Sequence, residues 1–265
     1  MNHKTRTSLW AWLWVIIGAL YFFVPMYGTF DFSLRMIKGQ ISLEAYRVII
    51  GDPLFQEAIV FSLEMAVITI LISVILFVPT TYWIHLRLPK LRPVVELITL
   101  LPFIVPTIVL VFGLIRTYGG PPFSLTNTGE TTNILLVGGY LVLSMPYMYR
   151  AIDVGLRSID VRVLTEASLS LGSSWWDVIL RVIVPNLRVA ILSGALITFA
   201  TVMGELVLAD FLVRPALGPY MVEIGKDRVF EPAALTIFSF AINWAAMGLI
   251  AFFARGGTAQ QITGR

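Results

Sequence analysis

The chain lacks cysteine and is poor in ionisable side chains, with 13% charged residues and two histidines among 265 residues. Without cysteine it has no disulfide, no thiolate metal ligand and no Cys nucleophile. So few charges cannot cover the surface of a soluble globule in which 57% of residues are hydrophobic. The formal net charge of +3 is small and does not indicate a nucleic-acid-binding patch. The composition therefore predicts a membrane protein.

Nucleotide-binding and hydrolytic motifs are also missing. No G-x-x-x-x-G-K-[ST] motif occurs, because Gly225-Lys226 lacks the preceding glycine and is followed by Asp227. There is no H-E-x-x-H and no histidine inside an apolar run, so an intramembrane enzyme would have few acid, base or metal groups. His85 has no second histidine or cysteine near it in sequence, which argues against a metal site. We therefore expect no catalytic residue, metal or cofactor in this chain.

What the chain does contain is a series of long apolar runs. They predict an all-α membrane protein with six transmembrane helices, at about residues 9–27, 57–84, 94–116, 132–149, 189–212 and 233–254. The first run has the charged start of a signal peptide, but it is long and aromatic and lacks a small-x-small cleavage site, so we interpret it as a retained helix. Pro102 and Pro106 predict a kink in the third span.

Basic residues fall mostly on one side of these spans, and this imbalance predicts the orientation. Twelve of the 19 lie on the side that holds both termini: Lys4, Arg6, Arg87, Lys90, Arg92, Arg150, Arg157, Arg162, Arg181, Arg188, Arg255 and Arg265. By the positive-inside rule this side is cytoplasmic. We expect an N-terminal helix and extracytoplasmic loop over 1–56, a core transmembrane domain over 57–254 and a cytoplasmic tail over 255–265.

The long polar, amphipathic stretch from Glu166 to Pro185 interrupts this pattern between the fourth and fifth spans. Just before and within it, apolar or small residues recur at i, i+3, i+4 and i+7, at Leu164, Ala167, Ser168 and Leu171, which predicts one face of a helix. Gly172 follows directly and can take the left-handed conformation that ends a helix. Such a projecting element is suited to docking, although an amphipathic loop can also merely cover the end of a helix bundle.

A second short helix is predicted after Gly172. Ser174-Trp175-Trp176-Asp177 resembles a capping box, and the helix it opens should run to Val184 and end at Pro185. The stretch is therefore expected to be a helix, a sharp turn and a second helix lying against the bilayer.

The same residues carry a family resemblance. The order Glu-Ala-small, three residues, Gly, nine residues, aliphatic-x-aliphatic-Pro is found here as Glu166, Ala167, Ser168, Gly172, Val182, Val184 and Pro185. It resembles the EAA motif of permease subunits of bacterial binding-protein-dependent ABC importers of type I. Ser168 replaces a second alanine, and valines replace Ile and Leu. Gly204-Glu205 followed by an apolar segment is similar to the polyamine, iron and thiamine branch of these permeases.

The resemblance implies a function and a set of partners. In such importers this cytoplasmic loop is the coupling helix, which seats in a groove of a cytosolic ATPase that binds ATP and Mg. It implies that Glu166 makes a polar contact with the ATPase, that Ala167 and Ser168 permit close approach, and that Gly172 sets the turn before the closing Pro185. The chain would lie in the bacterial inner membrane with a second, similar permease as a heterodimer, two ATPases and an extracytoplasmic solute-binding protein.

A polar stripe in the fifth span is the candidate substrate path. Gly194, Thr198, Thr201 and Glu205 share one helix face, and Asp210 lies nearer the outer end. The carboxylate of Glu205 in this stripe favours a cationic or amine-bearing solute, with polyamines first. Ferric ion, thiamine or an aminophosphonate are also compatible. The opposite interpretation is that Glu205 is buried against a neighbouring helix and that the threonines bond to their own backbone. An alternative function is an ion-coupled secondary transporter that uses Glu64, Glu205 and Asp210.

Overall fold

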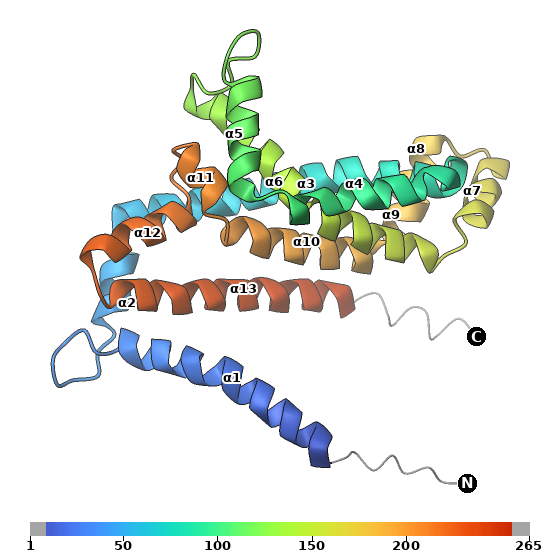
Figure 1. Cartoon of the computed structure of the whole chain (residues 1–265). Coiled ribbons are helices and arrows are strands. Elements are labelled where there is room, and N and C mark those ends of the chain that lie inside the picture. The colour runs from blue at the N-terminus through green and yellow to red at the C-terminus, as the bar shows by residue number, and fades with distance from the viewer. Residues whose placement is uncertain (1–8, 256–265) are drawn as a thin grey trace. The chain divides into compact units, whose positions relative to one another are not determined.

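The structure is a computed structural model that describes residues 9–255, and these residues form helices without any β-strand. The chain divides into two compact units (Figure 1). Unit 1 consists of Met1–Phe55 and Met221–Ile242, and unit 2 of Gln56–Tyr220 and Asn243–Arg265. Lys4, Arg6 and the predicted tail beyond Arg255 lie outside the described residues.

Unit 1 is built around the first apolar helix. Helix α1 covers Leu9–Ser33, beyond the predicted end at residue 27, and α2 covers Glu44–Ile50. The end of α1 is tied to α2 by a 2.7 Å hydrogen bond between the hydroxyls of Ser33 and Tyr46. Phe32 stacks on Phe230, with 4.9 Å between the ring centroids. None of the most apolar window of α1 is buried within the described chain.

The candidate membrane-spanning helices are more broken than the apolar runs predict. Four helices of the described chain are long and apolar enough to cross a membrane, and two bent pairs bring the number to six if each pair is one span. The four include α1, α3 (Pro53–Arg87), α6 (Gly129–Arg157) and α13 (Glu231–Arg255). The all-α membrane fold is therefore confirmed, with four to six candidate spans.

The first bent pair replaces the predicted kink in the third span with a break. After the short 3₁₀ turn η1 (Pro89–Leu91), helices α4 (Arg92–Ile104) and α5 (Thr107–Tyr118) meet at 102°. Val105 between them is extended, with φ −87° and ψ 117°. The following Pro106 excludes the helical conformation at Val105, whereas Pro102 is accommodated inside α4. A single proline therefore determines where this span breaks.

The second bent pair lies between α6 and α13 in sequence. The segment Trp175–Asn186 contains α8 (Trp175–Asp177), the π-helical η2 (Val178–Ile183) and α9 (Val184–Asn186), and it meets α10 (Arg188–Met203) at 75°. Helix α10 then packs along α6. Small residues permit this approach, since a Cβ at Gly194 would lie 2.7 Å from Met148 Sδ and one at Gly155 would lie 2.7 Å from Ala190 Cβ.

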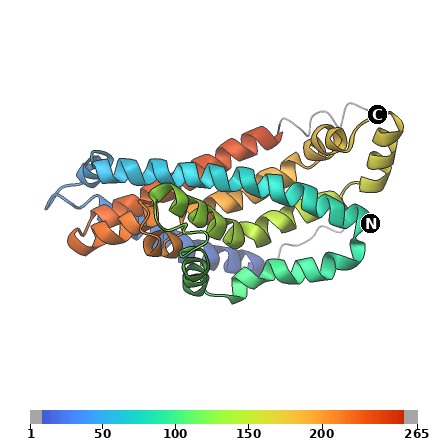
Figure 2. The ribbon, with the colours of Figure 1, turned by 90° about the horizontal axis from the view of Figure 1, so that it is seen from above.

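One buried cluster positions the loop between these helices. Helix α7 (Val161–Ser170) follows α6 and lies with α8 and α9 at one end of unit 2 (Figures 1 and 2). The cluster joins residues of α3, α6, α7, η2 and α10, including Tyr82, Ile152, Val161, Ile179 and Ala195. The polar loop is therefore packed into the helix bundle and is not a free connection.

Candidate functional site

The turn at Gly172 is closed by backbone hydrogen bonds. Gly172 has φ +86°, in the left-handed region that glycine favours. Its N–H donates to the Leu169 carbonyl at 2.9 Å, and the Ser173 N–H donates to the Ser168 carbonyl at 3.1 Å. This pair of bonds is the Schellman motif, which satisfies the carbonyls left free at the end of α7. The predicted helix end is confirmed.

The predicted capping box at the start of the second helix is also confirmed. The Asp177 N–H donates to Ser174 Oγ at 3.2 Å, and Ser174 Oγ donates to the Asp177 carboxylate at 2.7 Å. These hydrogen bonds, together with the charge of Arg181, hold the pKa of the Asp177 carboxyl below its usual value. The box fixes the direction in which the chain leaves the Gly172 turn.

The second helix does not end at Val184 as predicted. It continues through Pro185 to Asn186, and the chain bends at Leu187. Proline has no N–H for the carbonyl one turn earlier, and its ring pushes that carbonyl away, which accounts for the wide π-helical turn over Val178–Ile183. Asn186 Nδ2 donates to the Val182 carbonyl at 2.7 Å, so the helix passes the proline with this carbonyl satisfied.

The inner face of the loop is pinned to α3. Tyr82 OH and Thr165 Oγ1 form a buried 2.9 Å hydrogen bond, and Thr165 Oγ1 also donates to the Val161 carbonyl at 2.6 Å. Trp175 stacks near Trp83 with 5.1 Å between the centroids, and the Arg87 guanidinium lies 5.6 and 5.5 Å from the centroids of Trp83 and Trp175. A hydrogen bond and an aromatic contact therefore hold both of its helices on one span.

The outer face of the loop carries the motif residues. Ala167 and Glu166 are exposed, Ser168 is half-buried, and Leu171 is 88% exposed. The buried side chains of α7 are instead Val161 and Thr165. Ala167 and Leu171 of the predicted small face are thus left uncovered by the described chain, while Leu164 and Ser168 are half-buried. The Glu166 carboxylate forms no ion pair with any described residue. Trp176 and Leu180 of the second helix are also exposed.

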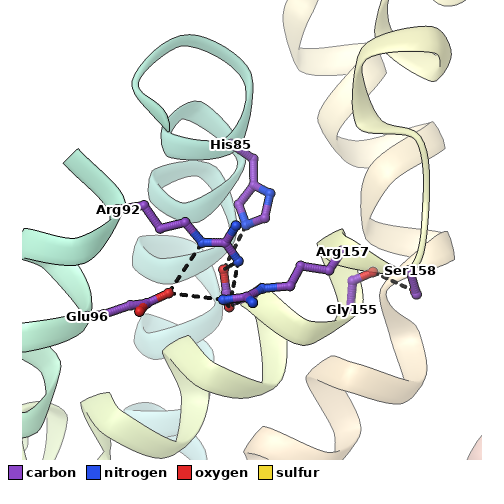
Figure 3. Close-up of polar contacts among 7 residues, drawn as sticks. His85, Arg92, Glu96, Gly155, Arg157 and Ser158 are labelled. Carbon is purple, nitrogen blue, oxygen red and sulfur yellow. Dashed lines mark hydrogen bonds and ion pairs between the residues drawn. The ribbon is translucent and has the colours of Figure 1, made fainter. Parts of the chain in front are cut away.

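A charge network centred on the buried Asp153 lies where α6 leads into this loop (Figure 3). Asp153 on α6 is 4% exposed and accepts hydrogen bonds from His85 Nε2 at 2.8 Å, from Arg92 at 2.8 Å and from Arg157 at 2.9 Å. Glu96 lies 3.0 Å from Arg157 and 3.3 Å from Arg92. Asp153 is not among the functional residues predicted from the sequence, although an acid four residues before Arg157 at the end of a span is a usable signal.

The candidate path residues lie in and beyond α10, and there the helix is interrupted. The fifth run was predicted as one helix over 189–212, but α10 ends at Met203 and α11 begins at Val207 and runs to Phe211. The buried Glu205 carboxylate accepts from the Leu208 N–H at 2.9 Å and from the Ala209 N–H at 3.3 Å. Glu205 thus caps the first turn of the next helix, which explains the break after Gly204.

The remaining stripe residues are engaged in packing or with the backbone. Thr198 is buried, and Thr201 Oγ1 donates to the Ile197 carbonyl at 2.8 Å. Asp210 and Glu64 are exposed. Among residues 9–255, Glu64, Glu205 and Asp210 form no ion pair, and no group of three metal-binding side chains is found in that range.

Comparison with known proteins identifies a family and several relatives that this chain resembles. Residues 86–257 match the family model of the binding-protein-dependent transport system inner membrane component. The chain is 26% identical over 216 residues to the spermidine/putrescine transport system permease protein PotB of Escherichia coli, covering 77% of each chain. It is 29% identical over 205 residues to the molybdenum transport system permease protein ModB of Azotobacter vinelandii, covering 74% of this chain and 88% of ModB.

A solved structure shares the fold. A chain of a bacterial ABC transporter involved in the import of the acidic polysaccharide alginate matches with a TM-score of 0.71 and 18% identity, covering 94% of this chain and 96% of that chain. The family model spans well over half of this chain, and it includes the loop from Glu166 to Pro185. The chain therefore belongs to the family of binding-protein-dependent transport system inner membrane components, as a permease subunit of a type I ABC importer.

Proposed function

We propose that the connection between α6 and α10 is the joint at which a cytosolic ATPase drives this permease. This connection, residues 158–187, contains the stretch from Glu166 to Pro185 and is called the 158–187 loop below. The observation that carries the proposal is the division of the loop into two faces. Tyr82 and Trp83 hold the inner face, while Glu166, Ala167 and Leu171 on the outer face have no covering partner in the described chain. A joint that transmits force needs one rigidly held side and one side free to bind.

The motif residues supply complementary parts of that joint. Ala167 and the half-buried Ser168 let a partner surface approach closely, and the free Glu166 carboxylate can pair with a donor of the ATPase. Gly172 fixes the turn, and Pro185 lies in the widened helix that leads into α10. Movement of the loop is thereby passed into a span that packs along α6.

This permease forms the translocation path for the solute but has no nucleotide-binding motif, so the proposed assembly includes a separate ATPase. It comprises this permease, a second and similar permease as a heterodimer, two ATPases that bind ATP and Mg, and an extracytoplasmic solute-binding protein. The distribution of Lys and Arg supports a cytoplasmic position for the loop and both termini in the bacterial inner membrane.

The proposed solute is small and amine-bearing, with polyamines first. The similarity to PotB supports this class. The similarity to ModB, a molybdenum permease, supports a different class at a comparable level of identity. The carboxylate of Glu205 caps α11, so any contribution it makes to a cationic path would be through its charge at the break between α10 and α11.

Docking can be tested with one labelled position, because the chain has no native cysteine. Ser170→Cys places a thiol on the exposed side of α7. A membrane-impermeant maleimide should label it in inside-out vesicles only, and the ATPase subunit should protect it. Adding Glu166→Lys should abolish protection and ATP-driven uptake while leaving membrane insertion intact. The acid-to-amide variant Glu223→Gln, in an exposed pair with Lys226, is the control.

Two results would contradict the docking proposal. Labelling from the outside would place the loop on the wrong face of the membrane. Unchanged protection and uptake in the Glu166→Lys variant would remove this loop as the joint. Uptake driven by an ion gradient in vesicles that contain this chain without an ATPase would instead establish the ion-coupled carrier.

The solute class is tested by comparing candidate solutes in the complete transporter. Uptake or binding-protein-stimulated ATP hydrolysis is measured with spermidine, putrescine and molybdate as separate probes. Stimulation by the amines alone supports the proposed class. Stimulation by molybdate alone would replace it with the class that the ModB similarity supports.

A further inference from the structure

The buried carboxylate of Asp153 collects three donors that come from three places in the fold. His85 belongs to the last turn of α3, Arg92 is the first residue of α4, and Arg157 is the last residue of α6. All three lie within 3.1 Å of the carboxylate oxygens, and Arg92 reaches both of them. Figure 3 shows these side chains converging between the helix ends. Asp153 is thus the shared acceptor of the contact between the α3–α4 connection and α6.

The network pairs two acids with two arginines and one histidine. An ionised carboxylate can only accept hydrogen bonds, so the proton on His85 that points at Asp153 resides on Nε2. The carboxylates of Asp153 and Glu96 pair with the guanidinium groups of Arg92 and Arg157. Removing the Asp153 charge would leave two arginines with only the half-exposed Glu96 as a partner. Breaking one member of a buried network is costly, while an intact one adds little net stability, so its geometry matters more than its energy.

The network of Asp153 lies where α6 joins the loop and where α3 joins α4. Arg157 is followed by Ser158, the C-cap of α6, and Asp160 is already the N-cap of α7. On the other side, only residues 88–91 separate α3 from Arg92 at the start of α4. The network therefore bridges the point at which the loop joins α6 and the point at which the chain enters the α4–α5 pair. The cluster around Tyr82 holds α3 to the loop, but it includes no residue of α4.

We propose that Asp153 is a positioning residue that transmits movement of the 158–187 loop to α4. This inference rests on the proposed function, because the loop must be driven for there to be a movement to transmit. When the loop is pulled, the end of α6 moves with it, and the ionic contacts of Asp153 with Arg92 oblige α4 to follow. Without that charge, α3 and α10 still follow the loop through their packing. Helix α4 then keeps the half-exposed Glu96–Arg157 ion pair and the packing of Phe103 on Tyr147 as its links to α6, and it follows less closely.

The first test does not require the ATPase. Two nitroxide labels are attached to cysteines introduced at exposed positions, Val94→Cys on α4 and Ser170→Cys on α7, and their distance distribution is measured in the isolated chain in nanodiscs. The distribution should be narrow in the parent and at least about twofold broader with Asp153→Asn, since buried ionic contacts fix geometry more than they stabilise. Glu223→Gln should leave it narrow. An equally narrow distribution in the Asp153→Asn chain would overturn the proposal.

The second test measures coupling in the complete transporter. With Asp153→Asn the ATPase should still protect Ser170→Cys from maleimide and hydrolyse ATP, but solute transported per ATP should fall about tenfold, a typical size for a coupling effect. The double variant Asp153→Asn with Arg92→Gln removes an acid and a base together, so it should recover thermal stability without recovering the coupling ratio. Recovery of both together would show a purely structural role and overturn the proposal. Loss of maleimide protection in the parent protein would instead be a failure of the docking joint itself.

Discussion

Asp153 and Glu205 are both carboxylates in or beside apolar spans, and both are buried, at 4% and 9% exposed. Their partners differ completely. Glu205 accepts from backbone N–H groups three and four residues further along the chain. Asp153 accepts from side chains 68 and 61 residues away as well as from Arg157. One acid ends and restarts a helix locally, and the other joins three helices.

The comparison shows that an acid in an apolar run is not by itself evidence for a solute path. For both acids, hydrogen-bond donors from other residues of the protein offset the free-energy cost of burying a carboxylate. Glu205 organises the break between α10 and α11, and Asp153 organises the entry to the loop. The two roles can be separated by replacing each acid and measuring what is lost.

The largest expected effect is on the long-range acid. Asp153→Asn should lower the free energy of unfolding by about 3 kcal/mol, because it removes the buried carboxylate that Arg92 and Arg157 share. The measurement is thermal unfolding of the purified chain in detergent, with Glu96→Gln as a matched, half-exposed acid of the same network. If Asp153→Asn lost no more unfolding free energy than Glu96→Gln, the contacts of Asp153 would contribute no more to stability than an exposed ion pair does.

A smaller effect is expected at the local acid. Glu205→Ala should cost about 2 kcal/mol, since the N–H groups of Leu208 and Ala209 lose a buried acceptor. Glu205→Gln keeps an acceptor oxygen and loses only the charge at the helix start, so it should cost about 0.5–1 kcal/mol. Hydrogen exchange of residues 207–211 should report the loss locally. Equal costs for the two variants would mean that the charge, and not the hydrogen bonds, is what Glu205 contributes.

The same distinction between local and long-range contacts explains how much the sequence could predict. The Gly172 turn and the Ser174–Asp177 box are made by residues at most five apart, and periodicity and spacing predict them correctly. The end of the second helix was misplaced because the π-helical turn and Asn186 together carry the chain past Pro185. The burial of Thr165 on the inner face of α7 could not be predicted, because its partner Tyr82 lies 83 residues away. The Asp153 network could not be assembled from sequence for the same reason.

The smallest effect should be found at Gly172, the most local feature of all. A Cβ at this position would meet nothing within 4 Å, so the only penalty of Gly172→Ala is its φ of +86°. That conformation costs an L-residue about 1 kcal/mol. Gly138→Ala is the matched control, because Gly138 is also free of contacts within 4 Å but lies inside α6, where alanine is favoured. Exchange of the Gly172 and Ser173 amides should therefore accelerate only in the first variant. If both variants exchanged alike, the turn would be held by the packing of the loop on α3, and the most local feature of the site would depend on a long-range contact after all.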